Sequence, residues 1–382
     1  MVFTEEQKLL RQSVREFCEK EVAPLVPDMV RTNIFPKGII EKIGEMGFLR
    51  VAVPESVGGL GLGQVELNIV MEEIARVSPA LALSCELSMV GAPNILMCKG
   101  ATDKYMEKVM SGEYTICGIG TQPKGNPQNA VEWDVSLTRD EDGVGYRLNQ
   151  TNICITNEAD AGMMYVYCKD DKGELYNVFI EGDWEGVERF EPDMKLGQAG
   201  TGGGTVRFNN VYIPPENVAP AAAGAEDGLY RVLNACAAEA LGCMKGIFEK
   251  TVEFCKTRTH NRLPMTTERA IAYKLAYLKT LIDTADALTY SAAVLRDELD
   301  PFDGTGDEDD VLAWHLRASA SKVRVSEIGV EVCDECIKLH GGLGYHDPTF
   351  HHWLGDSVNY CMMDWNNEMH LENIAYKMKL QG

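Results

Sequence analysis

The chain has 382 residues, of which 45% are hydrophobic and 25% are charged. This balance is typical of a globular protein with a buried core, and it excludes a disordered chain, a fibrous repeat and a small disulfide scaffold. Lys and Arg number 36 against 58 Asp and Glu, so the formal net charge is −22, and a surface this acidic disfavours a nucleic-acid partner.

The first segment, MVFTEEQKLLRQSVREF, predicts an amphipathic charged helix and lacks the apolar centre of a signal peptide. No later window reaches the roughly 18 uninterrupted apolar residues that a membrane span needs. We therefore expect a cytoplasmic protein without a membrane partner.

Helical, β-rich and again helical patterns follow one another along the chain. From Glu5 to about Gly112 apolar residues recur at helical spacing, with a Gly-rich turn at 53–63. From Tyr114 to about Val218, short β-branched and aromatic runs between Gly, Asp and Asn turns predict strands. An Ala/Pro/Gly linker at 214–228 comes next. Amphipathic patterns then predict four helices, over residues 229–257, 269–295, 311–339 and 364–379.

This order predicts an α+β fold with three domains. They are an N-terminal helical domain at residues 1–113, a middle β domain at 114–222, and a C-terminal helical domain at 223–382 built as a four-helix bundle. The acidic stretch 297–310 predicts a solvated loop between two helices.

The 12 Cys are scattered through apolar stretches, as reduced and buried thiols are in an intracellular protein. Cys333 and Cys336 are one helical turn apart, and we expect both to face the core, since no second pair supports a redox or metal role. His346, His351 and His352 match no ligand spacing. We predict no metal site.

Five phrases in a fixed order resemble the acyl-CoA dehydrogenase superfamily over almost the whole chain. They are FPKGIIEKIGEMGFLRVAVPESVGGLGLG, MEEIARVSPALA, TNICITNEADAG, MKLGQAGTGGGTVRFNNVYIPPENV and LHGGLGY. The resemblance implies an FAD-dependent oxidoreductase of fatty acid metabolism. Its reaction would be α,β-dehydrogenation of an acyl-CoA thioester, or the reverse enoyl-CoA reduction. The further implied partners are an electron-transferring flavoprotein and further copies of the chain, as a homodimer or homotetramer with the flavin at a subunit interface.

The resemblance places the catalytic base at Asp364, eight residues beyond Asp356. One subgroup of the family has Glu there, and the shorter Asp moves the carboxylate by about one carbon–carbon bond, which matters for proton transfer. Two alternatives stay open. Asp364 could cap the last helix, or the base could be Glu239 in the apolar run AAEALG. Glu239 could equally pair with a Lys or Arg.

The resemblance also assigns binding roles, residue by residue. Glu86 matches the floor of the acyl pocket, and Trp365 follows the base as a second substrate residue. The cofactor-binding positions are Thr121, Cys154, Thr156, Arg258, Lys338, Gly341, Gly342 and Asn366. Gly341 and Gly342 suit a turn where a Cβ would block the approach of a ligand.

Several of these positions depart from the family pattern. Cys154 stands where the family has a ring-stacking Trp, and Lys338 where it has Gln. The helix that holds the pantetheine arm of CoA is expected to begin two turns late. Two further functions therefore stay open. One is a flavoenzyme without CoA, of nitroalkane-oxidase or monooxygenase type; the other is a flavin-poor structural subunit of a heteromeric complex.

Overall fold

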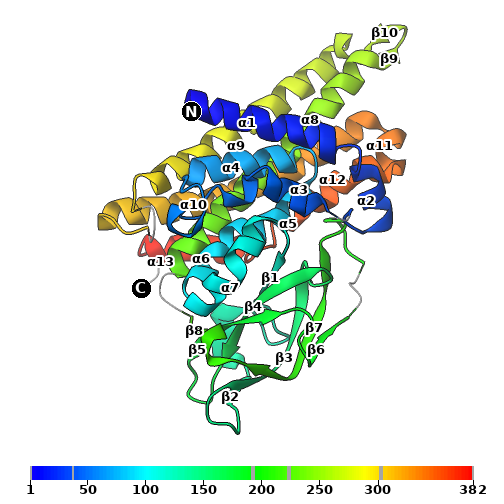
Figure 1. The fold of residues 1–382 in the computed structure, drawn as a ribbon. Helices are drawn as coiled ribbons and strands as arrows, with labels where there is room; N and C mark the ends of the chain where they lie inside the picture. The colour runs from blue at the N-terminus through cyan, green and yellow to red at the C-terminus, as the bar shows by residue number, and fades with distance from the viewer. Residues whose placement is uncertain (1, 37, 191–193, 222–224, 301–303, 381–382) are drawn as a thin grey trace.

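The computed structural model describes residues 2–36, 38–190, 194–221, 225–300 and 304–380. The N-terminal and C-terminal helices pack together as one layered body, and the β domain projects from one side of it (Figure 1). Within the described ranges, no helix combines the length and the apolar character needed to cross a membrane.

The N-terminal helices differ in burial. The helix α1 is amphipathic and lies at the surface, whereas almost every residue of α4 and α5 is buried. They are α1 (Glu5–Phe17), α2 (Val26–Thr32), α3 (Ile39–Glu45), α4 (Gln64–Ala75), α5 (Pro79–Val90), α6 (Ala92–Leu96) and α7 (Lys99–Met110), with short helical turns at Cys18–Val22, Phe48–Arg50 and Glu55–Val57. Thr4 and Gln7 form a capping box that starts α1. Ser78 caps α5, and Pro79 follows at its first position.

The β domain consists of two four-stranded sheets. Its elements are β1 (Thr115–Ile119), a 3₁₀ turn at Pro127–Glu132, β2 (Leu137–Arg139), β3 (Tyr146–Thr156), β4 (Ala161–Lys169), β5 (Leu175–Glu181), β6 (Val187–Arg189), β7 (Gly202–Ile213), a 3₁₀ turn at Pro215–Asn217 and β8 (Val218–Pro220). The strand orders are β1-β4-β5-β8 and β2-β3-β7-β6, and only the β1–β4 pair is parallel. Leu148, Val166 and Phe208 belong to the apolar core of this domain.

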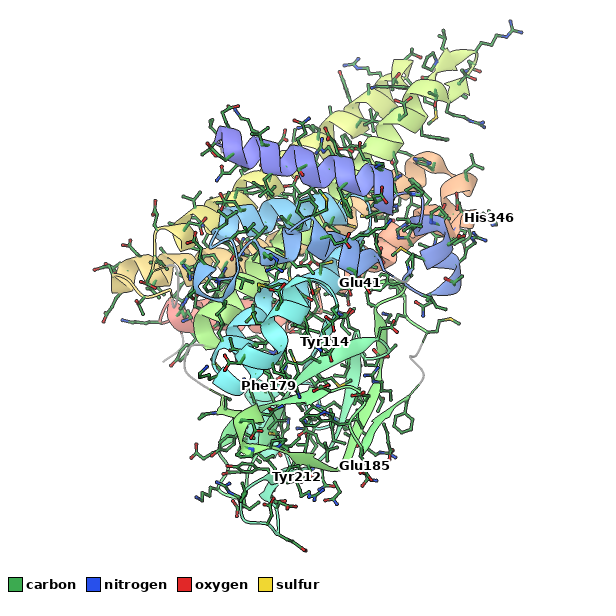
Figure 2. All side chains as sticks on the ribbon, in the orientation of Figure 1. Glu41, Tyr114, Phe179, Glu185, Tyr212 and His346 are labelled. Atoms are coloured by element: carbon green, nitrogen blue, oxygen red, sulfur yellow. The ribbon has the colours of Figure 1, made fainter. Side chains whose placement is uncertain are left out.

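A separate apolar cluster joins the β domain to the helices. Phe179 on β5 is fully buried against Tyr105 and Met106 of α7, and Tyr114 packs on the same cluster. Figure 2 shows Tyr114 and Phe179 between the helices and the sheets. The β domain is therefore fixed on the N-terminal helices.

Three long helices dominate the C-terminal region. Its elements are α8 (Ala225–Thr257), β9 (Thr259–His260), β10 (Leu263–Pro264), a 3₁₀ turn at Met265–Thr267, α9 (Arg269–Asp297), α10 (Glu308–His340), α11 (Gly342–His346), α12 (Pro348–Asn359) and α13 (Asn367–Lys377). The helix α8 lies at the centre, packed on α4, α5, α9, α10 and α12. The far ends of α8 and α9, closed by β9 and β10, project beyond the other helices (Figure 1).

Some element ends in this region differ from expectation, although residues 298–300 and 304–307 lie between α9 and α10 outside any helix, as predicted. Asp297 is not in a solvated loop, because it ends α9 and its carboxylate accepts from the backbone N–H groups of Gln64 and Val65 at 2.6 and 3.0 Å. It thereby caps the N-terminus of α4, where a negative charge is stabilised. The helix α8 begins at Ala225, inside the expected linker and before the expected start at residue 229.

The last helix also begins later than its pattern indicates. It starts at Asn367, and its cap is Asn366, whose side chain accepts from Met369 N. Asp364 therefore does not cap it. The core-facing placement of Cys333 and Cys336 is confirmed, since both are fully buried.

A buried ionic network ties α1 to the bundle. Arg76 at the end of α4 donates to Glu73 at 3.0 Å, to Glu249 at 2.7 Å and to Glu19 at 2.6 Å. Arg15 of α1 makes a two-point contact with the same Glu73 carboxylate, which is fully buried. The N-terminal helix is therefore held by charge-assisted hydrogen bonds as well as by apolar contact.

Candidate active site

Asp364 lies on the turn between α12 and α13, where the backbone is left-handed. Asp364 and Trp365 have φ of 46° and 74°, a region that non-glycine residues rarely adopt. The Lys322 ammonium from α10 donates to Trp365 O at 2.6 Å and to Asn367 Oδ1 at 3.0 Å. His370 Nε2 donates to Asp364 O at 2.8 Å. Two buried side chains thus hold this strained turn in place.

The turn directs the partly exposed Asp364 carboxylate against three buried residues, Glu86, Cys236 and Glu239, and these four form an acid cluster. The Cys236 thiol on α8 donates to Asp364 Oδ2 at 3.1 Å, and its sulfur lies 3.8 Å from Glu86 Oε1 on α5. One carboxylate oxygen of Glu86, one of Asp364 and the Cys236 sulfur all lie within 4.8 Å of one another. Three elements distant in sequence therefore converge on one point.

Glu239 lies on α8, one turn beyond Cys236 and on the same face. Its side chain is completely buried, and neither carboxylate oxygen has a hydrogen-bond partner in the part of the chain that the structure describes. No ion pair of Glu239 is found there either. Lys245, the next cation along α8, is paired with Glu72 and Asp286.

Burial controls the protonation of this cluster. Loss of water raises the pKa of Asp364, while the Cys236 thiol and the Lys322 charge lower it by stabilising the anion. Burial raises the pKa of Glu86 well above its usual range, and the charges of Glu239 and Asp364 raise it further. The same cause raises the pKa of Glu239, the Tyr360 hydroxyl lowers it by hydrogen bonding, and the charge of Asp364 raises it further. Burial thus favours the neutral forms of Glu86 and Glu239, whereas the neighbours of Asp364 act on its pKa in both directions.

A groove of about 510 Å³ opens at the end of α10, where Gly341 turns the chain into α11. It is lined by Phe254, Arg258, Met265, Leu339, His340, Gly341, Gly342, Leu343 and His346. Gly341 has φ of 60°, and nothing within 4 Å would meet a Cβ at either glycine, so the backbone here is open to a ligand. Figure 2 shows His346 at this edge of the molecule.

The polar groups of the groove suit a phosphate-bearing ligand. The His340 ring is stacked between Phe254 and Phe350 at 4.0 and 3.9 Å, and its Nε2 is buried without a partner in the described residues. Burial lowers the pKa of His340 to about 4, so the neutral ring can donate a hydrogen bond. Together with the Arg258 guanidinium, it fits the anionic part of a nucleotide.

A second group of predicted cofactor residues lies on the β domain. Thr121 follows β1, and its carbonyl accepts from Ile153 N and from the side chain of Asn152 at 3.1 and 3.0 Å. Cys154 lies in a bulge of β3 with φ of 57° and is exposed, two residues before Thr156. The edge of β3 thus gathers Thr121, Cys154 and Thr156.

Both helical regions match known family models. Residues 4–113 match the model described as Acyl-CoA dehydrogenase, N-terminal domain, and residues 231–379 match the model described as Acyl-CoA dehydrogenase, C-terminal domain. The chain belongs to the acyl-CoA dehydrogenase family.

Individual relatives match this chain over nearly its whole length. A 3-(aryl)acrylate reductase of Clostridium sporogenes is 28% identical over 90% of both chains. The caffeyl-CoA reductase-Etf complex subunit CarC of Acetobacterium woodii is 27% identical over 90% of both. The structure of butyryl-CoA dehydrogenase from Megasphaera elsdenii superposes with a TM-score of 0.88 over 100% of both chains at 23% identity.

The expected family, fold and enzyme class of this acyl-CoA dehydrogenase are confirmed. Its cofactor is FAD, as expected. The assignment of the two groups of polar residues described above, in the groove and near the end of β3, to this cofactor stays a prediction.

Three predicted positions lie outside both groups. Lys338 precedes the groove but does not line it, because its ammonium is paired with Asp334 and Glu335 at 2.5 and 3.1 Å. The Asn366 side chain caps α13. The Trp365 ring lies 5.8 Å from the ring of His370 and next to Asp364 in the chain.

Sequence reasoning missed Cys236, Lys322, His340 and His370. Cys236 is the one with a visible signal, since it lies three residues before Glu239 on the same helical face. Lys322 is a fully buried cation on α10, which is rare without a function or a partner. Its partners are two backbone carbonyls and the Asn367 side chain, which only the folded turn brings near.

Proposed function

We propose that this acyl-CoA dehydrogenase interconverts an acyl-CoA thioester and its α,β-unsaturated counterpart, with reduction of the enoyl form as the favoured direction. The observation that carries the proposal is the partly exposed Asp364 carboxylate, which contacts the buried Cys236 and Glu86 from a turn held by Lys322 and His370. This carboxylate transfers the α-proton in either direction.

Asp364 serves both directions of the reaction. Reduction needs its protonated form as proton donor to the α-carbon, a form that loss of water favours. Oxidation needs the anion, which Lys322 and the Cys236 thiol stabilise. The bound FAD supplies the group that accepts or donates the hydride at the β-carbon. Two relatives, the 3-(aryl)acrylate reductase and the caffeyl-CoA reductase subunit, have names that support the reductive direction.

The start of α8 supports the binding of CoA. The helix begins at Ala225, earlier than its sequence pattern predicts, which leaves room for a site for the pantetheine arm of CoA. The name of the Acetobacterium relative, a subunit of a complex with Etf, supports an electron-transferring flavoprotein as redox partner. The groove around Arg258 and the edge of β3 belong to different domains, which supports a homo-oligomer that holds FAD between subunits. We place the protein in the cytoplasm.

The reaction is tested with the purified flavoprotein under anaerobic conditions. The flavin is reduced chemically and mixed with crotonyl-CoA or cinnamoyl-CoA, and its absorption spectrum is followed. We expect the oxidised spectrum to return with at least one thioester, and the oxidised enzyme to be bleached more slowly by the saturated product. Reoxidation by oxygen alone, with no response to any thioester, would contradict the proposal.

One observation favours a second candidate, a flavoenzyme that acts on nitroalkanes without CoA. Nitroalkane oxidases of this superfamily have Asp at the position of the base, and this chain is similar to them in having Asp364 there. The shorter carboxylate suits a small substrate. Anaerobic mixing with nitroethane tests it directly. Bleaching by nitroethane but not by acyl-CoA would favour this candidate over the first.

A further inference from the structure

We infer that Glu86 and Glu239 select acyl thioesters that carry a positive charge on the γ-carbon, such as a protonated amine or a quaternary ammonium group. This inference rests on the proposed function, because it takes Asp364 as the group that meets the α-carbon.

The acid cluster holds two buried carboxyl groups that no cation of the described residues accompanies. Glu239 is 0% exposed and Glu86 1% exposed, and neither forms an ion pair within the described ranges. Neither oxygen of Glu239 has a well-formed hydrogen bond there; the Tyr360 hydroxyl lies close enough to lower its pKa but carries no charge. A buried carboxyl without a cation is costly to ionise, so its position is explained best by a cation that arrives with the substrate.

Two basic groups beside the Asp364 turn have other partners. The Lys322 ammonium is engaged by Cys361 O at 3.3 Å, Trp365 O at 2.6 Å and Asn367 Oδ1 at 3.0 Å. His370 donates its Nε2 proton to Asp364 O, and burial lowers its pKa to about 4, so its ring is neutral.

The spacing of the cluster fits a γ-substituent. The Glu86 and Asp364 oxygens that face Cys236 lie within 4.8 Å of each other. In a substrate whose α-carbon contacts Asp364, the atom attached to the γ-carbon lies three bonds, or about 3.8 Å, from the α-carbon. The atom attached to the γ-carbon then lies beside Glu86, and Glu239 is one helical turn farther along α8.

A cationic substrate and a neutral one have opposite effects on this cluster. A neutral alkyl or aryl tail leaves both carboxyls protonated and without partners. A cation allows at least one of them to ionise beside it in a medium of low dielectric constant, where the attraction is strong. The protein therefore gains affinity from the charge itself, in addition to the shape of the tail.

The test compares two isosteric enoyl-CoA thioesters, one with a γ-trimethylammonio group and one with a γ-tert-butyl group. They differ by one atom, nitrogen against carbon, and by one charge. We expect the wild-type enzyme to show a kcat/KM at least about tenfold higher for the cationic thioester. We expect Glu86→Gln and Glu239→Gln each to lower this ratio about tenfold or more. Glu253→Gln, an exposed carboxylate on the same helix, is the matched control and should leave the ratio unchanged.

Each outcome is decisive, and crotonyl-CoA run in parallel separates the two proposals. Activity with crotonyl-CoA and with the tert-butyl thioester, but no preference for the cation, would overturn this inference and leave the proposed function standing. Activity with no thioester would overturn both. The wild-type ratio is informative even if a Gln variant fails to fold. A stoichiometric metal ion in the purified protein, lost in Cys236→Ser, would also overturn the inference, because the cluster would then be a metal site.

Discussion

Cys236 and Asp364 are 128 positions apart in the chain, yet the Cys236 sulfur lies 3.1 Å from Asp364 Oδ2. The thiol is buried, and its own pKa is raised well above its usual range by loss of water and by the charge of Glu86. It is therefore a neutral donor that stabilises the Asp364 anion without adding charge. This contact links the central helix α8 to the turn that carries the proposed acid and base.

Replacing Arg258 by Ala should weaken FAD binding about tenfold to a hundredfold, because a charge-assisted hydrogen bond to a phosphate is lost. The measurement is the FAD dissociation constant of the apoprotein, followed by flavin fluorescence. Lys256→Ala removes an exposed cation on the same helix outside the groove and is the control. Equal FAD affinity of the Arg258 variant and the control would show that the FAD pyrophosphate does not bind in this groove.

Replacing Glu239 by Gln should stabilise the protein increasingly as the pH rises. In the folded state the pKa of Glu239 lies well above its usual value, so the folded protein keeps a proton that the unfolded chain loses. The free energy of unfolding of the wild type therefore falls with pH above about pH 5, by up to about 1.4 kcal/mol per pH unit, and the variant lacks this loss.

The measurement is urea denaturation of both proteins from pH 5 to pH 9. Glu253→Gln should run parallel to the wild type over this range, since its carboxylate is exposed. A constant difference in the free energy of unfolding between Glu239→Gln and the wild type would show that the Glu239 carboxyl is not protonated in the folded state.

Replacing Arg76 by Met should destabilise the fold by about 3 kcal/mol, because Glu73 stays buried with one cationic partner fewer. Arg31→Met, which breaks an exposed pair with Asp28, should cost less than about 1 kcal/mol. Thermal and urea unfolding of both variants provide the comparison. Similar losses in the two variants would mean that the network around Glu73 contributes no more than a surface pair.

The order of the three regions was predictable because helical and strand periodicities differ along the chain. The long helices matched their patterns within a few residues, except where tertiary contacts decided the ends. Asp297 caps α4 across 233 positions of sequence, and no local pattern signals such a contact. Asp364 lies outside the last helix because Lys322 and His370 hold the preceding backbone in a left-handed turn.

The site was predictable only in part, for the same reason. Counting from Asp356 reaches Asp364, and the glycines after His340 indicate a ligand turn. The acidic residues at 86 and 239 were visible as carboxyls in apolar runs. Their convergence with Cys236 was not, because it depends on how α5 and α8 pack.

We propose that Asp364 exchanges a proton with the α-carbon of a thioester. The most direct measurement is the incorporation of deuterium from D₂O into the α-position of a saturated acyl-CoA, followed by mass spectrometry under anaerobic conditions. We predict that the wild-type enzyme catalyses this exchange, and that Asp364→Asn retains FAD but loses at least about a hundredfold in exchange rate. Undiminished exchange in the Asp364→Asn enzyme would contradict the account and direct attention to Glu239 as the base.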